Sequence, residues 1–364
     1  MKNQKRYGLK RNNKKKYKII MEDDEQNKIV FKNKKFLKSK KFIKSNQVNI
    51  NINVKFIMKS ILLIILLISF LTLKKKKKEI KNGNNTDYYA CFVAMGKMEN
   101  KYARELVEYY LKLGVGKFIF GDNNLPNTEK LADVLQDYID DGTVDIIELF
   151  GSSFGQSALN NVTYEKYNKK CKWMLFFDFD EYLEVHFEDK KSLTLKTFLE
   201  NKIFNKCESI LFNNLMYTDN NLVHYDNRPL NVRFTEPNYN LPANTLIKSI
   251  VRGNLNKTIF VNGMSNHRPV EGVEICDSKG RKITKYDPYF LKPPVHDYGY
   301  IKHFTTKTAE EYITKILKGI PGNHPHDVNS RIELFFRCNK YSDEKMKIFE
   351  NYFNRTFERY RKYK

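Results

Sequence analysis

Between residues 88 and 177, short apolar runs alternate with segments in which apolar residues recur at helical spacing. The apolar runs predict buried strands and the periodic segments predict amphipathic helices. This alternation is typical of βαβ units, in which crossover helices join parallel strands. The predicted strands are 88–95, 117–120, 143–150 and 172–177, and the predicted helices are 100–113, 128–139 and 157–168. The sequence therefore predicts an α/β fold with a mostly parallel central sheet and helices on both faces.

The chain has 364 residues and a formal net charge of +23. The position of the basic excess along the chain bears on whether the folded domain binds nucleic acid. Residues 1–81 hold 25 of the 65 basic residues and 5 of the 42 acidic ones, which leaves 40 against 37 in 82–364. A nucleic-acid-binding domain carries its basic excess on the folded unit itself. We therefore expect no specific nucleic-acid partner. Binding of nucleic acid or anionic membranes through residues 1–59 is the alternative.

Composition divides the chain into four segments. Residues 1–55 are rich in Lys and Asn without a sustained apolar period, and we expect a basic, mostly disordered tail. Residues 56–73 are almost continuously apolar, and as a helix they would reach roughly 27 Å, close to a hydrocarbon core of about 30 Å. They predict a transmembrane signal anchor. Residues 74–87 form a linker, and 88–364 the folded domain.

A cleavable signal sequence that starts at Met58 is the alternative to an anchor. Lysines occupy 74–78 and no small-x-small cleavage site follows the apolar run, which favours an uncleaved anchor. Lysines flank both ends, so the positive-inside rule leaves the orientation nearly undecided, and the longer basic tail favours a cytosolic N-terminus. We expect a single-pass membrane protein, type II in the Golgi or ER if the source is eukaryotic.

The cysteines are odd in number and widely spaced, with no C-x-x-C pair. They fit neither a disulfide-dense secreted scaffold nor a zinc ribbon, and they leave room for one or two disulfides in an oxidising compartment. They are Cys91, Cys171, Cys207, Cys276 and Cys338.

Acidic residues follow the predicted strands at the edge where ligands bind in such sheets, beyond the carboxyl ends. Glu99 follows the first strand, Asp122 the second, and the pair Asp178 and Asp180 the fourth. Alternate residues of an extended segment project to one side, so the pair can converge on one divalent cation. Without Cys or paired His nearby, Mg²⁺ or Mn²⁺ suits them best. One helix cap and one surface Asp would be the structural alternative.

Four blocks in order resemble glycosyltransferase family 92 and related family 2-like enzymes of the GT-A fold. They are CFVAMGKMENKYARELVEYYLKLGVGKFIFGDNN, WMLFFDFDEYLEV, KSIVR at 248–252 and IKHFTTKTAEEYITKILKG at 301–319. The resemblance covers 89–319. It implies a metal-dependent transfer of a hexose from a nucleotide-diphosphate sugar, with a UDP-sugar expected, to a hydroxyl of a glycan or glycoconjugate. A GT-A-like membrane protein that binds a glycan or partner without turnover is the alternative.

The resemblance also implies roles for individual residues. In the family pattern the nucleotide pocket would be lined by Ala94, Lys97, Glu99, Asp122 and Asp178. The metal ligands would be Asp178 and Asp180 with His303, whose neutral imidazole can complete the coordination of Mn²⁺. A core or surface histidine is the alternative for His303.

The chain departs from the family pattern at several positions. Met98 replaces the usual Asn, Leu215 replaces a Trp, and Thr218 and Asn221 replace two Gly residues. The last three lie on the acceptor side, so these departures bear on acceptor preference more than on donor binding.

An inverting transfer needs a carboxylate that takes the proton of the acceptor hydroxyl. Asp219 is the first candidate, because it follows the predicted strand 209–217 and matches an acid of the family loop. Glu236 and Glu271 come next. An Asp-Asn-Asn turn is also a common loop element without a catalytic role. To the helical region 331–363 we assign packing and no chemistry.

Overall fold

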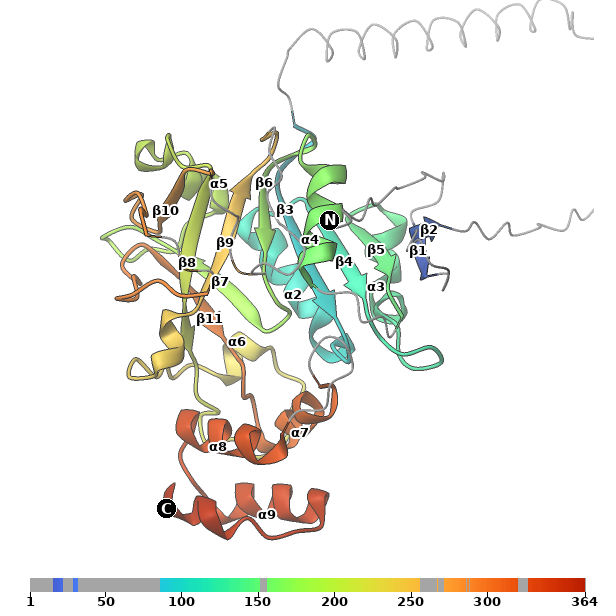
Figure 1. The fold of residues 1–364 in the computed structure, drawn as a ribbon, viewed down its shortest axis with the longest axis vertical. Helices are drawn as coiled ribbons and strands as arrows, with labels where there is room; N and C mark the ends of the chain where they lie inside the picture. Colours follow the sequence, from blue (N-terminus) through green and yellow to red (C-terminus); the bar gives the residue numbers. More distant parts are fainter. Residues whose placement is uncertain are drawn as a thin grey trace, which may run out of the picture. The chain divides into compact units, whose positions relative to one another are not determined.

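The computed structural model describes residues 16–21, 29–31, 86–150, 156–255, 267, 272–285, 287, 289–319 and 327–363. The chain divides into two compact units, Met1–Asn33 with Tyr88–Lys364, and Lys34–Asp87. All described strands and helices belong to the first (Figure 1). The predicted anchor at 56–73 lies outside the described residues, and among the described helices none is long and apolar enough to cross a membrane.

A mixed sheet forms the centre of the first unit, in the order β2-β1-β5-β4-β3-β6-β9-β8-β11-β7, with β10 paired to β8. Its strands are β1 (Lys16–Met21), β2 (Ile29–Phe31), β3 (Tyr88–Gly96), β4 (Lys117–Asp122), β5 (Val144–Glu148), β6 (Cys171–Phe176), β7 (Glu181–Val185), β8 (Ser209–Met216), β9 (Ile247–Arg252), β10 (Ile275–Asp277) and β11 (Gly299–His303). The α/β class is confirmed. The run β5-β4-β3-β6 is parallel as predicted, whereas β9 and β7 pair antiparallel with their neighbours.

Two strands lie in the tail that the sequence predicts to be mostly disordered. β1 pairs in parallel with β5, and β2 pairs antiparallel with β1. Both segments contain short runs of β-branched and aromatic residues, which suit a strand at an open sheet edge.

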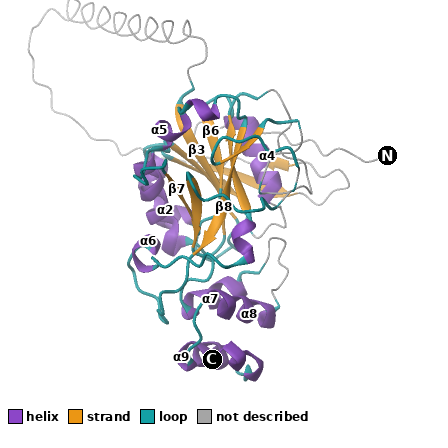
Figure 2. Ribbon diagram, turned by 90° about the vertical axis from the view of Figure 1, so that its left-hand side faces the viewer, coloured by secondary structure: helices purple, strands orange, loops and turns teal. Residues whose placement is uncertain are grey.

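Helices cover both faces of the parallel half, as predicted. These are α2 (Asn100–Leu113), α3 (Leu131–Asp140) and α4 (Gln156–Tyr167). Side chains of successive strand residues point to opposite faces. Phe92 and Phe120 thus pack in one core with α2 and α3, whereas Val93 and Ile119 pack in another with α4. Figure 2 shows α2 and α4 on opposite sides of the sheet.

The helix ends follow from local chemistry. α2 ends at Gly114, whose φ of 104° is left-handed and whose N–H bonds the carbonyls of Leu111 and Tyr110, as expected for a C-terminal cap. α3 starts at Leu131, three residues later than predicted, because the Asp122 carboxylate accepts the Leu131 N–H at 2.9 Å.

The C-terminal helices build a separate small core. The remaining helices are α5 (Leu195–Leu199), α6 (Leu230–Arg233), α7 (Ala309–Leu317), α8 (Val328–Cys338) and α9 (Asp343–Phe353), with short 3₁₀ helices at Lys202–Phe204, Pro242–Thr245 and Glu358–Tyr363. α7, α8 and α9 bury Tyr312, Ile316, Phe335 and Phe349 against one another. Figure 1 shows these helices together beyond one end of the sheet.

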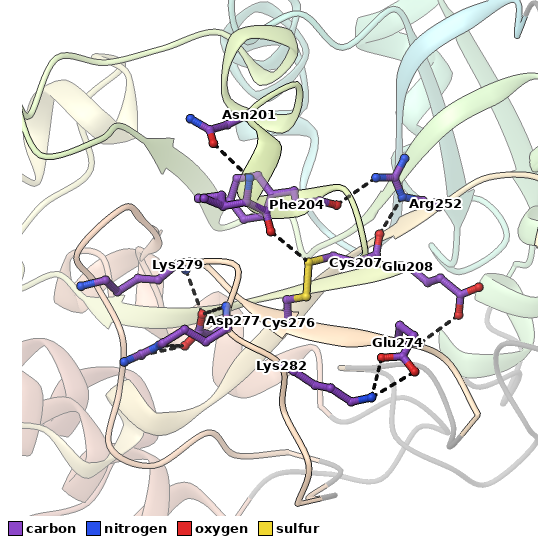
Figure 3. The surroundings of a disulfide bond; sticks show 12 residues. Asn201, Phe204, Cys207, Glu208, Arg252, Glu274, Cys276, Asp277, Lys279 and Lys282 are labelled. Carbon is purple, nitrogen blue, oxygen red and sulfur yellow. Dashed lines mark hydrogen bonds and ion pairs between the residues drawn. A yellow bond between two sulfur atoms is a disulfide. The ribbon is translucent and has the colours of Figure 1, made fainter.

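Two disulfides brace the sheet. Cys91–Cys171 joins the neighbouring strands β3 and β6, and Cys207–Cys276 joins the segment before β8 to β10. Beside the second disulfide, the Arg252 guanidinium donates to the carbonyls of Cys207 and Phe204 (Figure 3). Cys338 is buried and not disulfide-bonded.

Candidate functional site

A cavity of about 340 Å³ lies at the carboxyl ends of β3, β4 and β6. The strands deliver acidic side chains to it, and α7 and α8 bring basic ones from the opposite side. Its charged lining residues are Lys97, Glu99, Asp178, Asp180, Lys315, Lys318 and Arg331. The sheet edge predicted to carry the site therefore does carry a cavity.

Asp178 is held by two polar partners. Its Oδ2 lies 2.6 Å from Nζ of Lys248 on β9, and its Oδ1 accepts a hydrogen bond of 2.6 Å from Nε2 of Gln156. Burial raises the pKa of Asp178, but the Lys248 ammonium outweighs it and holds the pKa below its ordinary value. Asp178 is therefore charged at neutral pH.

Asp180 is more strongly surrounded by cations. Its Oδ2 lies 2.7 Å from Nζ of Lys315 and 3.7 Å from Nζ of Lys307, and its Oδ1 lies 3.5 Å from Nε2 of His303. Burial raises the pKa of Asp180, but these three groups together hold it well below its ordinary value. Nδ1 of His303 lies 2.9 Å from Nδ2 of Asn214, which fixes the ring. The structure thus brings His303 and Asp180 together.

The side chains of the three predicted metal ligands are of types that bind divalent cations, but each of them contacts other side chains in this structure. Two carboxylates and an imidazole suit Mn²⁺ or Mg²⁺. Within the described residues, no three Asp, Glu, His or Cys side chains form a ready metal-binding group. Lys248 and Lys315 occupy one oxygen of each carboxylate. A metal ion would therefore compete with two ammonium groups.

The other residues predicted for the nucleotide pocket have different surroundings. Lys97 and Glu99 line the cavity, and Glu99 is paired with Lys318. Asp122 is buried and caps α3, and burial raises its pKa. The Ala94 side chain is buried in the core with α2 and α3.

Asp219 lies in a separate cavity of about 300 Å³, which it lines with Glu236 and Asn339. Its Oδ2 is 2.6 Å from Nζ of Lys345 on α9, and both side chains are only 1% exposed. Burial raises the pKa of Asp219, and Lys345 opposes this rise without cancelling it. Glu271 lies outside the described residues.

A family model, glycosyltransferase family 92, matches residues 86–362. The chain belongs to glycosyltransferase family 92. The resemblance found in the sequence is thereby confirmed, together with the assignment to the glycosyltransferases. No curated protein sequence matches the chain.

Solved structures of Staphylococcus aureus TarS match this family 92 chain weakly. TarS 1–349 in complex with UDP is 16% identical over 35% of this chain and 36% of that one, with a TM-score of 0.27. TarS 1–349 is 12% identical over 72% of each chain (TM-score 0.32), and TarS is 13% identical over 68% of this chain and 42% of that one (TM-score 0.33). At such TM-scores these matches carry no argument about the fold or the activity.

Sequence reasoning predicted Lys97 but missed three other cations of the candidate site in this family 92 chain. Arg331 belongs to the region 331–363, to which only packing was assigned, and Lys315 and Lys318 were assigned no role, yet all three line the cavity. The signal was present, because Lys315 and Lys318 are three residues apart at the C-terminal end of α7 and lie within the block 301–319.

A larger cavity lies away from the predicted residues. It measures about 530 Å³ and runs along α2 and the edge strand β7, lined by Glu105, Tyr109 and Glu184 among others. None of the residues predicted for the site lies in its lining.

Proposed function

We propose that this family 92 domain transfers a hexose from a nucleotide-diphosphate sugar to a hydroxyl of a glycan or glycoconjugate, with inversion, on a GT-A scaffold. A UDP-sugar is the donor to test first. The observation that carries the proposal is the cavity at the strand ends, where Asp178 and Asp180 face Lys315, Lys318 and Arg331. Carboxylates and cations in one cavity suit a ligand that carries both hydroxyl groups and phosphates.

Asp178, Asp180 and His303 are the residues that would hold Mn²⁺ or Mg²⁺. When bound, such an ion neutralises the charge that develops on the departing diphosphate. Because the depressed pKa keeps both aspartates ionised, they can hold a cation at neutral pH. Lys315 is paired with Asp180 through a side chain that is 20% exposed, whereas Lys248 beside Asp178 is only 1% exposed. The exposed lysine is therefore the one that can give way.

We propose Asp219 as the base that accepts the proton of the acceptor hydroxyl. Its raised pKa supports this role, because a base is most effective when its pKa approaches the working pH. Its ion pair with Lys345 and its position in a cavity separate from that of Asp178 and Asp180 support a purely structural role instead. Substitution of Asp219 and of Lys345, each alone, distinguishes the two roles.

We further propose that the domain matures in an oxidising compartment, with the anchor at 56–73 holding it to the membrane. Two disulfides within the described domain support this, because disulfides persist in the ER lumen and outside cells and are rare in the cytosol.

The proposal is tested on the full chain, purified in detergent, with a panel of UDP- and GDP-sugars and with and without EDTA. We expect one donor to be consumed, EDTA to stop its consumption, and Asp178→Asn and Asp180→Asn to abolish it. Asp140→Asn on the exposed face of α3 is the matched control and should act as wild type. If no donor is consumed and Asp178→Asn leaves nucleotide binding unchanged, the non-catalytic binding protein is the better description.

A further inference from the structure

We propose that Lys315 of α7, Lys318 at the C-terminal cap of α7 and Arg331 of α8 form the binding site for the diphosphate of the donor and stabilise it as the leaving group. This inference rests on the proposed function, because it presupposes a nucleotide-diphosphate donor. It gives the C-terminal helices a chemical role in addition to packing.

The geometry of α7 directs these lysines to the cavity. Residues three or four positions apart share a helix face. Tyr312 and Ile316 lie in the core that α7 shares with α8 and α9. Lys315 in the last turn of α7 and Lys318, the residue that caps its C-terminus, both line the cavity. The small C-terminal core therefore holds the two ammonium groups over the carboxyl ends of the strands.

Both ammonium groups retain capacity for an anion. Nζ of Lys315 donates to Oδ2 of Asp180 and to Oγ1 of Thr305, each at 2.7 Å. Lys318 donates to Glu99. A lysine ammonium has three N–H donors, so within the described contacts Lys315 uses two of them and Lys318 one. Their side chains are 20% and 21% exposed, so an anion that enters the cavity can reach them.

The charge of the cavity favours an anion. Four cationic side chains line it, against three carboxylates, Glu99, Asp178 and Asp180. The buried ammonium of Lys248 beside Asp178 is matched by the buried carboxylate of Glu181, 3.4 Å away, and leaves this balance unchanged. The excess is therefore positive although the strand ends are acidic. A diphosphate supplies several negative oxygens, to which charge-assisted hydrogen bonds from Lys and Arg are strong.

These cations would act on the bond that breaks. In the transfer, the acceptor oxygen forms a bond to the anomeric carbon, and the bond from that carbon to the β-phosphate oxygen breaks. The electron pair stays on the phosphate oxygen, and the proton of the acceptor hydroxyl passes to the base. Donors fixed near the phosphate stabilise the charge that develops there. Lys315, Lys318 and Arg331 are thus assigned to the leaving group.

The experiment compares nucleoside diphosphate with nucleoside monophosphate. Full-length wild type and the variants Lys315→Met, Lys318→Met and Arg331→Met are titrated with UDP and UMP by calorimetry, or with GDP and GMP if a GDP-sugar is the donor. We expect each variant to bind the diphosphate about tenfold more weakly, with a smaller change for the monophosphate, because one charge-assisted hydrogen bond is lost. Lys347→Met, on an exposed part of α9, is the control and should leave both affinities unchanged.

Further variants separate binding from folding. Lys315→Met leaves Asp180 without its nearest cation, so Lys315→Arg, which keeps the charge, should retain most of the preference for the diphosphate. The double variant Glu99→Gln with Lys318→Met removes both partners of one pair and should still bind the diphosphate weakly. Thermal melting of each variant verifies that it is folded.

Two results would overturn the inference, and they differ in whether the proposed function also fails. If wild type prefers UDP to UMP and the folded variants keep that ratio, the cations are not the diphosphate site although the proposed function stands. If wild type binds neither UDP nor GDP, the proposed function fails and the inference fails with it.

Discussion

Nζ of Lys248 lies 2.6 Å from Oδ2 of Asp178 and 3.4 Å from Oε2 of Glu181, and the lysine side chain is only 1% exposed. Glu181 is completely buried, and its Oε2 also accepts the Asp178 N–H at 2.9 Å. One buried ammonium therefore serves two carboxylates directly after β6. This makes Lys248 a fixed part of the site, in contrast to Lys315.

Lys248→Met should destabilise the protein by about 3 kcal/mol or more, because removal of one partner leaves a buried carboxylate uncompensated. Urea denaturation at pH 7 measures the change in the free energy of unfolding. Lys282→Met is the control, since its pair with Glu274 is more than half exposed on both sides and should contribute little. Equal effects of the two substitutions would contradict a buried counter-ion role.

The pair of Glu311 and Arg233 predicts how stability depends on pH. Two hydrogen bonds of 2.8 and 2.9 Å join them, and both side chains are 1% exposed. Burial raises the pKa of Glu311, but Arg233 outweighs it and holds the pKa below its ordinary value. A depressed carboxyl pKa contributes stability above the ordinary value of about 4.3, and this stability is lost as the pH falls through the folded-state pKa.

Glu311→Gln should therefore cost about 3 kcal/mol at pH 7, because Arg233 is left buried and unpaired. The difference from wild type should shrink as the pH falls below about 4.3, where the wild-type carboxyl also becomes protonated. Urea denaturation at several pH values between 3 and 7 tests this. A difference that stays constant over that range would refute it. Glu310→Gln, on the exposed side of the same helix turn, is the control.

The sequence predicted the parallel half of the fold well and the other half poorly. Every predicted strand and helix from 88 to 177 exists, because continuous apolar runs and helical periodicity are local signals. The antiparallel strands β7 and β9 were not predicted. β9 contains Lys248 and Ser249, which are both buried. Polar residues in a sequence predict an exposed segment, and their burial here depends on contacts with residues distant in sequence. Likewise Asp178 and Asp180 could be predicted from a motif, whereas their partners Lys248 and Lys315 come from a strand and a helix distant in sequence.

The two disulfides should contribute strongly to stability. They close loops with sequence separations of 80 and 69 residues, and in the chain-entropy model each contributes about 4 kcal/mol. Cys207→Ala with Cys276→Ala should lower the melting temperature and reduce the further effect of dithiothreitol, which can then act only on Cys91–Cys171. Cys338→Ala, which removes the free buried thiol, should keep the full response to dithiothreitol. No response in wild type would mean that the bonds do not form.

Met98 should be the source of local backbone strain. Its φ is 55°, a left-handed conformation that Asn adopts readily and Met does not, and its side chain is 40% exposed. Met98→Asn restores the residue of the family pattern and should stabilise the protein by about 1 kcal/mol. Met98→Leu has the same backbone preference as wild type and should change nothing. A loss of stability in Met98→Asn, measured by urea denaturation, would show that the side chain contributes more than the backbone costs.

Substitutions of Asp219 and Lys345 distinguish a catalytic role of Asp219 from a role of the ion pair in anchoring α9. Asp219→Asn removes both the candidate base and the ion pair that ties α9 to the end of β8, whereas Lys345→Met removes only the ion pair. If Asp219 is the base, Asp219→Asn should lower kcat by about 10² to 10⁴, and Lys345→Met should lose stability while keeping most of the activity. Glu236→Gln, in the same cavity, tests the second candidate. Equal losses of stability with kcat within a few-fold of wild type for both substitutions would assign the pair to anchoring. The proton of the acceptor hydroxyl would then have to pass to a carboxylate other than Asp178 or Asp180. The cations around these two hold their pKa values low, which makes them poor proton acceptors.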